Sequence, residues 1–332
     1  MQKILALRPM AWWALFIAAV LTAPLWANDS LILLLVLAGL YGITAVGLDM
    51  LIGYAGQISF GQAGFIAMGA YGSALLSMNT DLAPWLTIPL AAIIVALCAW
   101  VMGAIILRLK GHYLAMATFA FGQVVFLLVG TLEVTGGASG LYGIPPLSLF
   151  GTDIVTPTQA FFLAWLIFAV CLFAALRIKD SRVGRALLAL RYDETAASAC
   201  GVNVHLMKTH VFALSALMAG IAGGIFAHYF SVVSADSFTV HLSILVMAIV
   251  VVGGMGTAWG TVIGTLLLTV VPGLLLTSTR YNGLLYGVIY IAVFLLFPQG
   301  IAGALTQFRD SARASPKKGD AAPSAPVASG QP

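Results

Sequence analysis

Long apolar runs, separated by short polar segments, dominate the chain from residue 10 to residue 299. A helix needs about 20 mainly apolar residues to cross the hydrocarbon core of a bilayer, and the runs are close to that length. The pattern predicts an all-α polytopic membrane protein with about ten transmembrane helices, or eight to nine if some segments are re-entrant. The expected spans lie near residues 10–27, 31–52, 58–78, 86–107, 113–132, 159–177, 210–230, 241–256, 259–276 and 283–299.

Two polar stretches interrupt this pattern. Residues 178–209 form the long polar segment that has apolar runs on both sides. Residues 309–332 are rich in Ala, Pro, Ser and Gly, and such a segment cannot bury enough apolar surface to fold. We therefore expect one transmembrane domain over residues 1–308, which includes the loop at 178–209, and a disordered tail over residues 309–332.

Composition and charge agree with a membrane protein. Hydrophobic residues make up 61% of the 332 residues and charged residues 8%, whereas charged residues make up about a quarter of an ordinary soluble domain. With ten spans, fourteen of the fifteen Lys and Arg residues fall on one side of the membrane, and Arg280 falls on the other. The positive-inside rule then places both termini and the loop at 178–209 in the cytoplasm.

The N-terminal run has two interpretations. Lys3 and Arg8 precede an apolar stretch, as in a secretory signal peptide. The stretch is long, however, and it carries Trp12, Trp13 and Trp26, which suit the interfacial anchors of a retained helix. We favour the retained first helix.

The sequence lacks the motifs of common catalytic and metal sites. It contains no GxxxxGK[ST], GxSxG or HExxH motif and no pair of carboxylates within a predicted span. The five histidines are scattered, and His228, near a helix end, suits packing better than metal ligation. Cys98, Cys171 and Cys200 form no CxxC pattern and predict no disulfide framework. We expect no enzymatic activity, no metal site and no cofactor bound by this chain.

Residues 48–76 combine six glycines with polar side chains in an apolar setting, among them Gln57, Ser59 and Gln62. Non-helical backbone at membrane depth is tolerated only inside protein or along an aqueous cavity, so one interpretation is a discontinuous element that lines a translocation path. The alternative is close packing between helices, which small residues also produce. The GxxG spacing recurs at residues 253–256, which hints at an internal duplication.

Asp49 is the main ionisable side chain within a predicted span. A buried charge at that depth indicates a functional site, whereas a position near the membrane interface leaves the carboxylate solvated, and both alternatives stay open. The candidate path residues, chosen from polarity and motif position, are Asp49, Gly53, Tyr54, Gly56, Gln57, Ser59, Gln62, Thr118 and Gln123.

A short helix is expected within the polar loop. Asp193 suits the N-cap, Glu194 suits the positive end of the helix dipole, and Gly201 suits the left-handed position after the helix. About two turns are too few to be stable alone in water, so neighbours or a partner must hold this helix. Its small side chains suit a partner's groove, and the alternative is an ordinary solvated loop helix. The expected contact residues are Arg185, Arg191, Asp193, Glu194, Ala196, Ala197 and Gly201.

Seven motifs together carry a resemblance over roughly residues 31–303. They are GYAGQISFGQAGFIAMGAY (53–71), RLKGHYLAMATFAFGQ (108–123), TGGASGLYGIP (135–145), GRALLALRYDETAASACGVNV (184–204), AGIAGGIFAHYFSVVSADSF (219–238), VVVGGMGTAWGTVIG (250–264) and FPQGIAG (297–303). In these segments the chain resembles the integral-membrane permease subunits of branched-chain amino acid ABC importers.

The resemblance implies an all-helical permease in the inner (plasma) membrane of a bacterial cell, paired with a second, homologous permease. Two cytoplasmic ABC ATPases, which use ATP and Mg, and a periplasmic solute-binding protein would complete the importer. In this family residues 193–201 correspond to the coupling helix, which docks on an ATPase. The outer loops, including residues 133–157, would face the binding protein. No nucleic acid is expected as a partner.

The sequence departs from the family pattern at several positions, which leaves the transported solute open. Relatives often have Asn at the position of Asp49, His at that of Gln62 and Glu at that of Gln123. The expected substrates are Leu, Ile and Val, and the alternative within the family is urea, short amides or aromatic acids. A secondary carrier driven by an ion gradient is the competing class of function.

Overall fold

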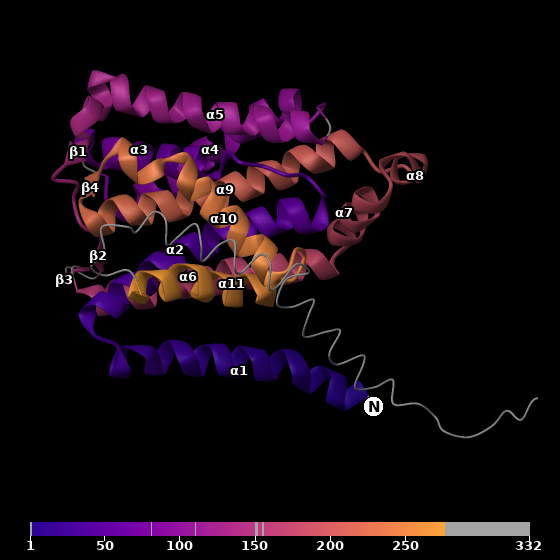
Figure 1. The fold of residues 1–332 in the computed structure, drawn as a ribbon, viewed down its shortest axis with the longest axis horizontal. Coiled ribbons are helices and arrows are strands. Elements are labelled where there is room, and N and C mark those ends of the chain that lie inside the picture. Colours follow the sequence, from indigo (N-terminus) through magenta and orange to yellow (C-terminus); the bar gives the residue numbers. More distant parts are fainter. Residues whose placement is uncertain (1, 81, 110, 150–151, 155, 276–332) are drawn as a thin grey trace, which may run out of the picture.

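The computed structural model of the protein describes residues 2–275 except 81, 110, 150–151 and 155, and most of these residues are helical (Figure 1). The long helices are α1 (Gln2–Trp26), α2 (Asp29–Asp49), α3 (Gln62–Asn79), α4 (Pro84–Ile106), α5 (His112–Thr131), α6 (Pro157–Asp180), α9 (Val204–Phe230), α10 (Val240–Gly253) and α11 (Ala258–Leu275). Two shorter helices, α7 (Arg182–Tyr192) and α8 (Glu194–Ala199), connect α6 to α9.

Six segments are long and apolar enough to cross a membrane, and they fit a polytopic helical membrane protein. They are Asp29–Tyr54, Pro84–Ile106, His112–Thr131, Pro157–Asp180, Val204–Phe230 and Ala235–Gly253. Shorter apolar helices cover Trp12–Trp26 and Ala258–Leu274. The tenth expected span, residues 283–299, and the expected tail, residues 309–332, lie outside the described residues.

Two small strand pairs are exceptions to the expected all-helical fold. β1 (Leu141–Tyr142) pairs antiparallel with β4 (Val232–Val233), so that Leu141 lies opposite Val233. β2 (Ser148–Leu149) pairs in the same way with β3 (Thr152–Asp153). The sequence did not predict them because two residues are too few to show the alternation that identifies a strand.

The polar loop is more helical than expected. α6 ends at Asp180 rather than at residue 177, and α9 begins at Val204 rather than at residue 210. Side chains cap the starts of the following helices: Ser181 Oγ accepts from Gly184 N at 3.3 Å, and Asn203 Oδ1 accepts from Leu206 N at 3.1 Å. Caps and backbone hydrogen bonds carry these helices beyond the apolar runs.

Small residues bring α9 close to α3 and α4 at the centre of the bundle. A Cβ atom on Gly69 would collide with the backbone of Gly220, and one on Gly223 would collide with the carbonyl oxygen of Ile66. Helices in lipid gain little from hydrophobic burial, so close backbone approach takes over as a source of stability. α5 lies at the edge of the bundle, because only 22% of the residues in its apolar stretch are buried, compared with 67% in the apolar stretch of α9.

The bundle has two distinct ends. Figure 1 shows α7 and α8 together at one end, where α1 also begins, and the four short strands at the other. The N-terminus of α1 therefore lies on the same side as the cationic loop, in agreement with the charge analysis.

His228 fastens the segment between α5 and α6 to the strand end of the bundle. Its buried ring bonds through Nδ1 to the carbonyl oxygen of Pro145 at 2.7 Å and through Nε2 to Ser73 Oγ at 2.9 Å. A carbonyl can only accept, so Nδ1 carries the proton and Nε2 of the neutral ring accepts from the serine hydroxyl. Trp85 Nε1 also donates to Ser148 O, 2.5 Å away. His228 is thus a packed side chain, as expected.

Candidate functional site

The continuous helix of α2 breaks before residue 62. It passes into a π-helical turn, η1 (Met50–Tyr54), and regular helix resumes only with α3 at Gln62. Gly56 has a φ of +68°, which favours glycine, and Gln57 N bonds back to Leu51 O at 3.1 Å. The element at residues 48–76 is therefore discontinuous, and the expected span at 58–78 begins four residues later than predicted.

Asp49 is buried, which decides between the two interpretations of this residue. Only 1% of its surface is exposed, and its Oδ1 accepts a hydrogen bond from Gly256 N at 2.6 Å. Gly256 has a φ of +82° and belongs to the glycine turn between α10 and α11. The solvated alternative is wrong, because the carboxylate binds backbone inside the protein.

Two cationic side chains bind backbone carbonyl groups at Gly53 and at Gly256. Lys179, near the end of α6, donates to Gly256 O at 2.8 Å, and Arg191, near the end of α7, donates to Gly53 O. A Cβ atom on Gly53 would collide with the backbone of Gly256. We call Asp49, Gly53, Lys179, Arg191 and Gly256 the polar joint, because these residues connect α2, α6, α7 and the α10–α11 turn.

The polar joint has a physical rationale in its charges. A carboxylate buried in the membrane is costly unless it is hydrogen-bonded and lies near opposite charge, and both conditions are met here. The two GxxG segments that share a spacing in the sequence, at 53–56 and 253–256, are the two turns that meet in the joint. Tyr54 beside it is fully buried, and Lys179 Nζ lies 5.7 Å from the centre of its ring.

The expected short helix is present as α8, and both of its predicted caps are confirmed. Asp193 Oδ1 accepts from Thr195 N at 2.8 Å and from Ala196 N at 3.1 Å. Gly201 has a φ of +84°, and Val202 N bonds to Ala197 O at 3.1 Å, which completes a Schellman motif.

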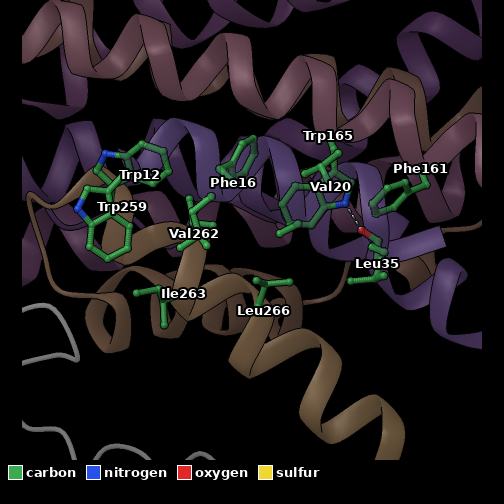
Figure 2. A pocket seen from close by; sticks show the side chains of 13 residues that line it. Trp12, Phe16, Val20, Leu35, Phe161, Trp165, Trp259, Val262, Ile263 and Leu266 are labelled. Carbon is green, nitrogen blue, oxygen red and sulfur yellow. Dashed lines mark hydrogen bonds between the residues drawn. The ribbon is translucent and has the colours of Figure 1, made fainter. Parts of the chain in front are cut away.

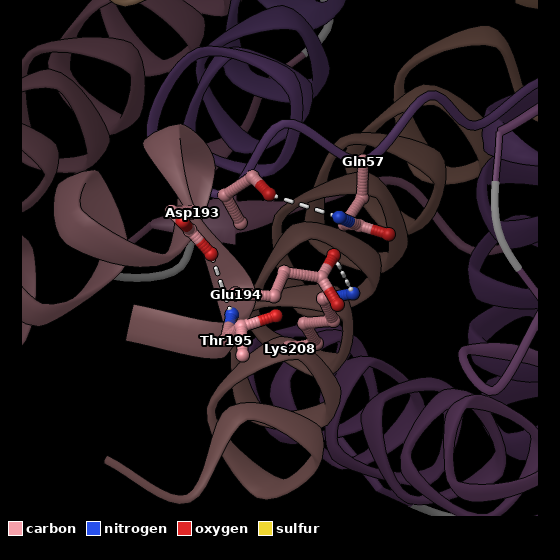
Figure 3. A network of polar contacts seen from close by, with 6 residues as sticks. Gln57, Asp193, Glu194, Thr195 and Lys208 are labelled. Carbon is pink, nitrogen blue, oxygen red and sulfur yellow. Dashed lines mark hydrogen bonds and ion pairs between the residues drawn. The ribbon is translucent and has the colours of Figure 1, made fainter. Parts of the chain in front are cut away.

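An ion pair holds α8 to α9 (Figure 3). Lys208 Nζ lies 2.5 Å from Glu194 Oε1, and the Lys208 side chain is 3% exposed while that of Glu194 is 34% exposed. Ala197 is buried within the chain, so it is not available to a partner; Ala196, Ala199 and Cys200 are exposed. The ion pair with Lys208 therefore attaches α8 to its own chain. The face of α8 that carries the small exposed side chains remains accessible to a partner.

The remaining arginines of the loop behave differently from one another. Arg185 Nη1 donates to Asp180 O at 3.1 Å on the surface, whereas Arg191 reaches inward to the polar joint. α7 itself was not expected, although its sequence carries a signal: Ser181 caps it, and Leu187 and Leu190, three residues apart, are both buried.

Three other candidate path residues, Ser59, Gln62 and Thr118, lie around the start of α3 rather than in the polar joint. Thr118 Oγ1 accepts from Phe60 N at 3.1 Å, and Ser59 Oγ accepts from Gly61 N at 3.3 Å. Gln62 Nε2 donates to Ser215 Oγ at 3.0 Å, while its Oε1 has no partner among the described residues.

Sequence reasoning missed two serines at this position. Ser215 of α9 bonds to Gln62, and Ser243 Oγ of α10 accepts from Ala63 N at 2.9 Å. Gln57 bonds locally, through Nε2 to Ala55 O at 3.0 Å, and Gln123 of α5 is half-buried. A single serine in an apolar span can be recognised in the sequence as a possible hydrogen-bonding residue, but the sequence does not show which residue it bonds to. Of the predicted set, Asp49 and Gly53 belong to the polar joint, while Ser59, Gln62 and Thr118 form a polar cluster at the start of α3. Gly56 lies beside Arg191, and the described contacts of Gln57 and Gln123 place neither in these two groups.

An open apolar hollow lies beside this cluster. It has a volume of about 400 Å³ and is lined by Phe60, His112, Ala115, Met116, Phe119 and Ile244, which places it between α5 and α10. Among the described residues, no group of three His, Cys, Asp or Glu side chains lies close enough to hold a metal ion. The described contacts within both clusters are hydrogen bonds.

Comparison with known proteins gives a consistent result. The family described as "Branched-chain amino acid transport system / permease component" matches residues 30–297. The permease protein LivM of the high-affinity branched-chain amino acid transport system is 34% identical in Salmonella typhimurium and 33% in Escherichia coli, over 79% of this chain and 67% of each relative. LivH of Salmonella typhimurium is 28% identical over 80% of this chain and 92% of its own length. No solved structure matches. The chain belongs to the family of branched-chain amino acid transport permeases.

Proposed function

We propose that this chain is the permease subunit of an ABC importer that moves branched-chain amino acids into the cytoplasm, in the inner membrane of a bacterial cell. The family match carries the proposal, and the names of LivM and LivH supply the substrate class. The chain is a transport subunit and not an enzyme; ATP and Mg are used by two separate ATPases. A periplasmic binding protein delivers the solute. The proposed topology has ten helices with both termini in the cytoplasm.

The polar joint supports a mechanical role for the cationic loop. α8 is short and is held by the Glu194–Lys208 pair, so a push on α8 passes directly to α9. α7 is bonded through Arg191 to Gly53, in the π-helical turn η1 that follows α2. An ATPase that moves α7 and α8 therefore acts on α9 and on the two glycine turns at once.

The translocation path is proposed to run along the α5–α10 hollow, against a second permease. α5 is the least buried of the six long spans, and the hollow opens beside Phe60 and Thr118. The polar cluster at the start of α3 lies directly behind it. A second, homologous permease that covered α5 would close the hollow into an enclosed route.

Uptake in proteoliposomes tests the function. The complete complex, with its ATPases and binding protein, is expected to accumulate Leu, Ile and Val only when ATP is inside the vesicle and binding protein outside. A panel that includes urea, short amides and aromatic acids decides the substrate. Accumulation by this chain alone under an ion gradient would replace the importer with a secondary carrier.

Two variants test the docking role of α8. Glu194→Arg and Gly201→Leu are expected to abolish ATP-driven uptake while the protein still inserts in the membrane. Cys200 is exposed directly after α8, and it provides an attachment point for a crosslinker in a Cys98→Ser background. Capture of an ATPase through Cys200 is the expected result, and normal uptake by both variants contradicts the docking role.

A further inference from the structure

A partly open apolar cavity lies between α1 and the rest of the bundle. Its volume is about 340 Å³, and it is walled by α1 on one side and by α2, α6 and α11 on the other (Figure 2). Representative lining residues are Trp12, Phe16, Leu35, Trp165, Trp259 and Leu266. No residue of the polar joint lines the cavity, and nothing in the proposed transport cycle uses it.

The cavity is elongated along α1. Figure 2 shows Trp12 and Trp259 at one end and Phe161 and Leu35 at the other. On α1 the lining runs from Trp12 to Ala23, a distance of about 17 Å at 1.5 Å per residue. This shape suits an extended chain better than a compact solute.

The lining provides no free polar group for a solute. Its side chains are aliphatic or aromatic, and the ring N–H of Trp165 is already bonded to Leu35 O at 3.0 Å. An amino acid or amide would lose its hydrogen bonds with water there and gain none. The cavity therefore suits a hydrocarbon ligand, and in a bilayer the acyl chain of a lipid is the available hydrocarbon.

A cation lies beyond the tryptophan end of the cavity. Arg177 is exposed, with its guanidinium carbon 4.9 Å from the centre of the Phe173 ring. Phe173 contacts Trp13, and Trp13 contacts Trp259, with ring centres 6.2 Å and 5.1 Å apart. No carboxylate of the described residues lies within ion-pair distance of Arg177. Tryptophans beside a free arginine are typical of the level of lipid head groups.

We propose that this cavity binds one acyl chain of an anionic phospholipid, with the phosphate group at Arg177, and that this lipid joins α1 to the helix bundle. The apolar walls supply the chain site and the arginine supplies the preference for an anionic head group. The site is independent of which solute the importer moves.

Native mass spectrometry of the full chain, extracted with its lipids by a copolymer instead of detergent, tests the site. The wild-type protein is expected to retain one phospholipid. Ala19→Phe fills the cavity and is expected to lose it, whereas Leu21→Phe, at an exposed position outside the lining, retains it. Arg177→Gln is expected to keep a lipid but to lose the preference for an anionic one. Equal retention by Ala19→Phe and Leu21→Phe overturns the proposal.

A photocrosslinking amino acid at Val20 provides a second measurement that does not depend on a cavity-filling variant. Val20 lines the cavity, so a covalent adduct with the mass of a phospholipid is expected. A crosslink to residues 276–332 of this chain, or to another subunit, in place of that adduct would show that protein fills the cavity and would overturn the proposal.

Discussion

The carboxylate of Asp49 accepts a hydrogen bond from the backbone N–H of Gly256, 2.6 Å away, although 207 positions separate the two residues in the chain. This bond joins the end of the first long described span after α1 to the turn between α10 and α11. Lys179 and Arg191 bind the carbonyl oxygens of the same two turns, so the cationic loop is bonded to the interior of the membrane domain.

Removal of the Asp49 oxygen is expected to destabilise the protein. Asp49→Leu leaves the Gly256 N–H without its acceptor, at a cost of about 2 kcal/mol. Asp49→Asn keeps an oxygen acceptor and is expected to cost less. Thermal unfolding in lipid nanodiscs measures the difference, with the exposed Asp29→Asn as control. Unfolding of Asp49→Leu at the wild-type temperature contradicts the proposed importance of this bond.

Added volume at Gly53 is expected to separate the two glycine turns. A Cβ atom there has no room beside the Gly256 backbone, so Gly53→Ala should lower Tm and reduce uptake at least tenfold. Gly72→Ala is the matched control, because its nearest neighbour, the Ala91 Cβ, lies at an ordinary 3.4 Å. Equal uptake by the two variants means that the turns are not tightly joined during transport.

The Glu194–Lys208 pair is expected to show strong coupling in a double-mutant cycle. Glu194→Ala leaves the nearly inaccessible Lys208 ammonium unpaired, but the partial exposure of Glu194 limits the loss of stability to about 1–2 kcal/mol. Lys208→Met in the same chain removes the unpaired charge and should restore most of the stability. Chemical denaturation of the four proteins yields the coupling free energy, and additive effects would show that the pair contributes nothing to the attachment of α8.

Loss of the His228 ring is expected to loosen the segment between α5 and α6. His228→Ala leaves the Pro145 carbonyl without its partner and leaves Ser73 Oγ with Thr87 Oγ1 alone, at a cost of about 2 kcal/mol. Hydrogen exchange at Leu141 and Tyr142 should become faster, because β1 then loses its support. His241→Gln, at an exposed position, serves as control. Unchanged protection of these two amides would assign the support to the β1–β4 pair alone.

Local features of the chain were well predicted from sequence. The boundaries of most long helices agree within a few residues, because a bilayer requires a minimum apolar length that is visible in the sequence. The caps of α8 were also predicted, since Asp193 and Gly201 act on backbone within three residues of themselves.

Partners distant in the chain were not predictable. Sequence alone left the burial of Asp49 open, gave no partner for Lys208 and treated nine path candidates as one group. The structure places some members of that group in the polar joint and others at the start of α3. It also places Ser215 and Ser243, which sequence reasoning overlooked, beside Gln62 and Ala63.

The sequence by itself determined a helical membrane protein, the capped helix in the loop and its family, while its orientation by charge stays a prediction. Tertiary structure decided which turns meet, which charges are buried and where α1 leaves a cavity. The physical reason is the range of the interactions: span length, capping and charge bias act within a segment, whereas close packing of glycines and pairing of buried polar groups depend on helices that only folding brings together.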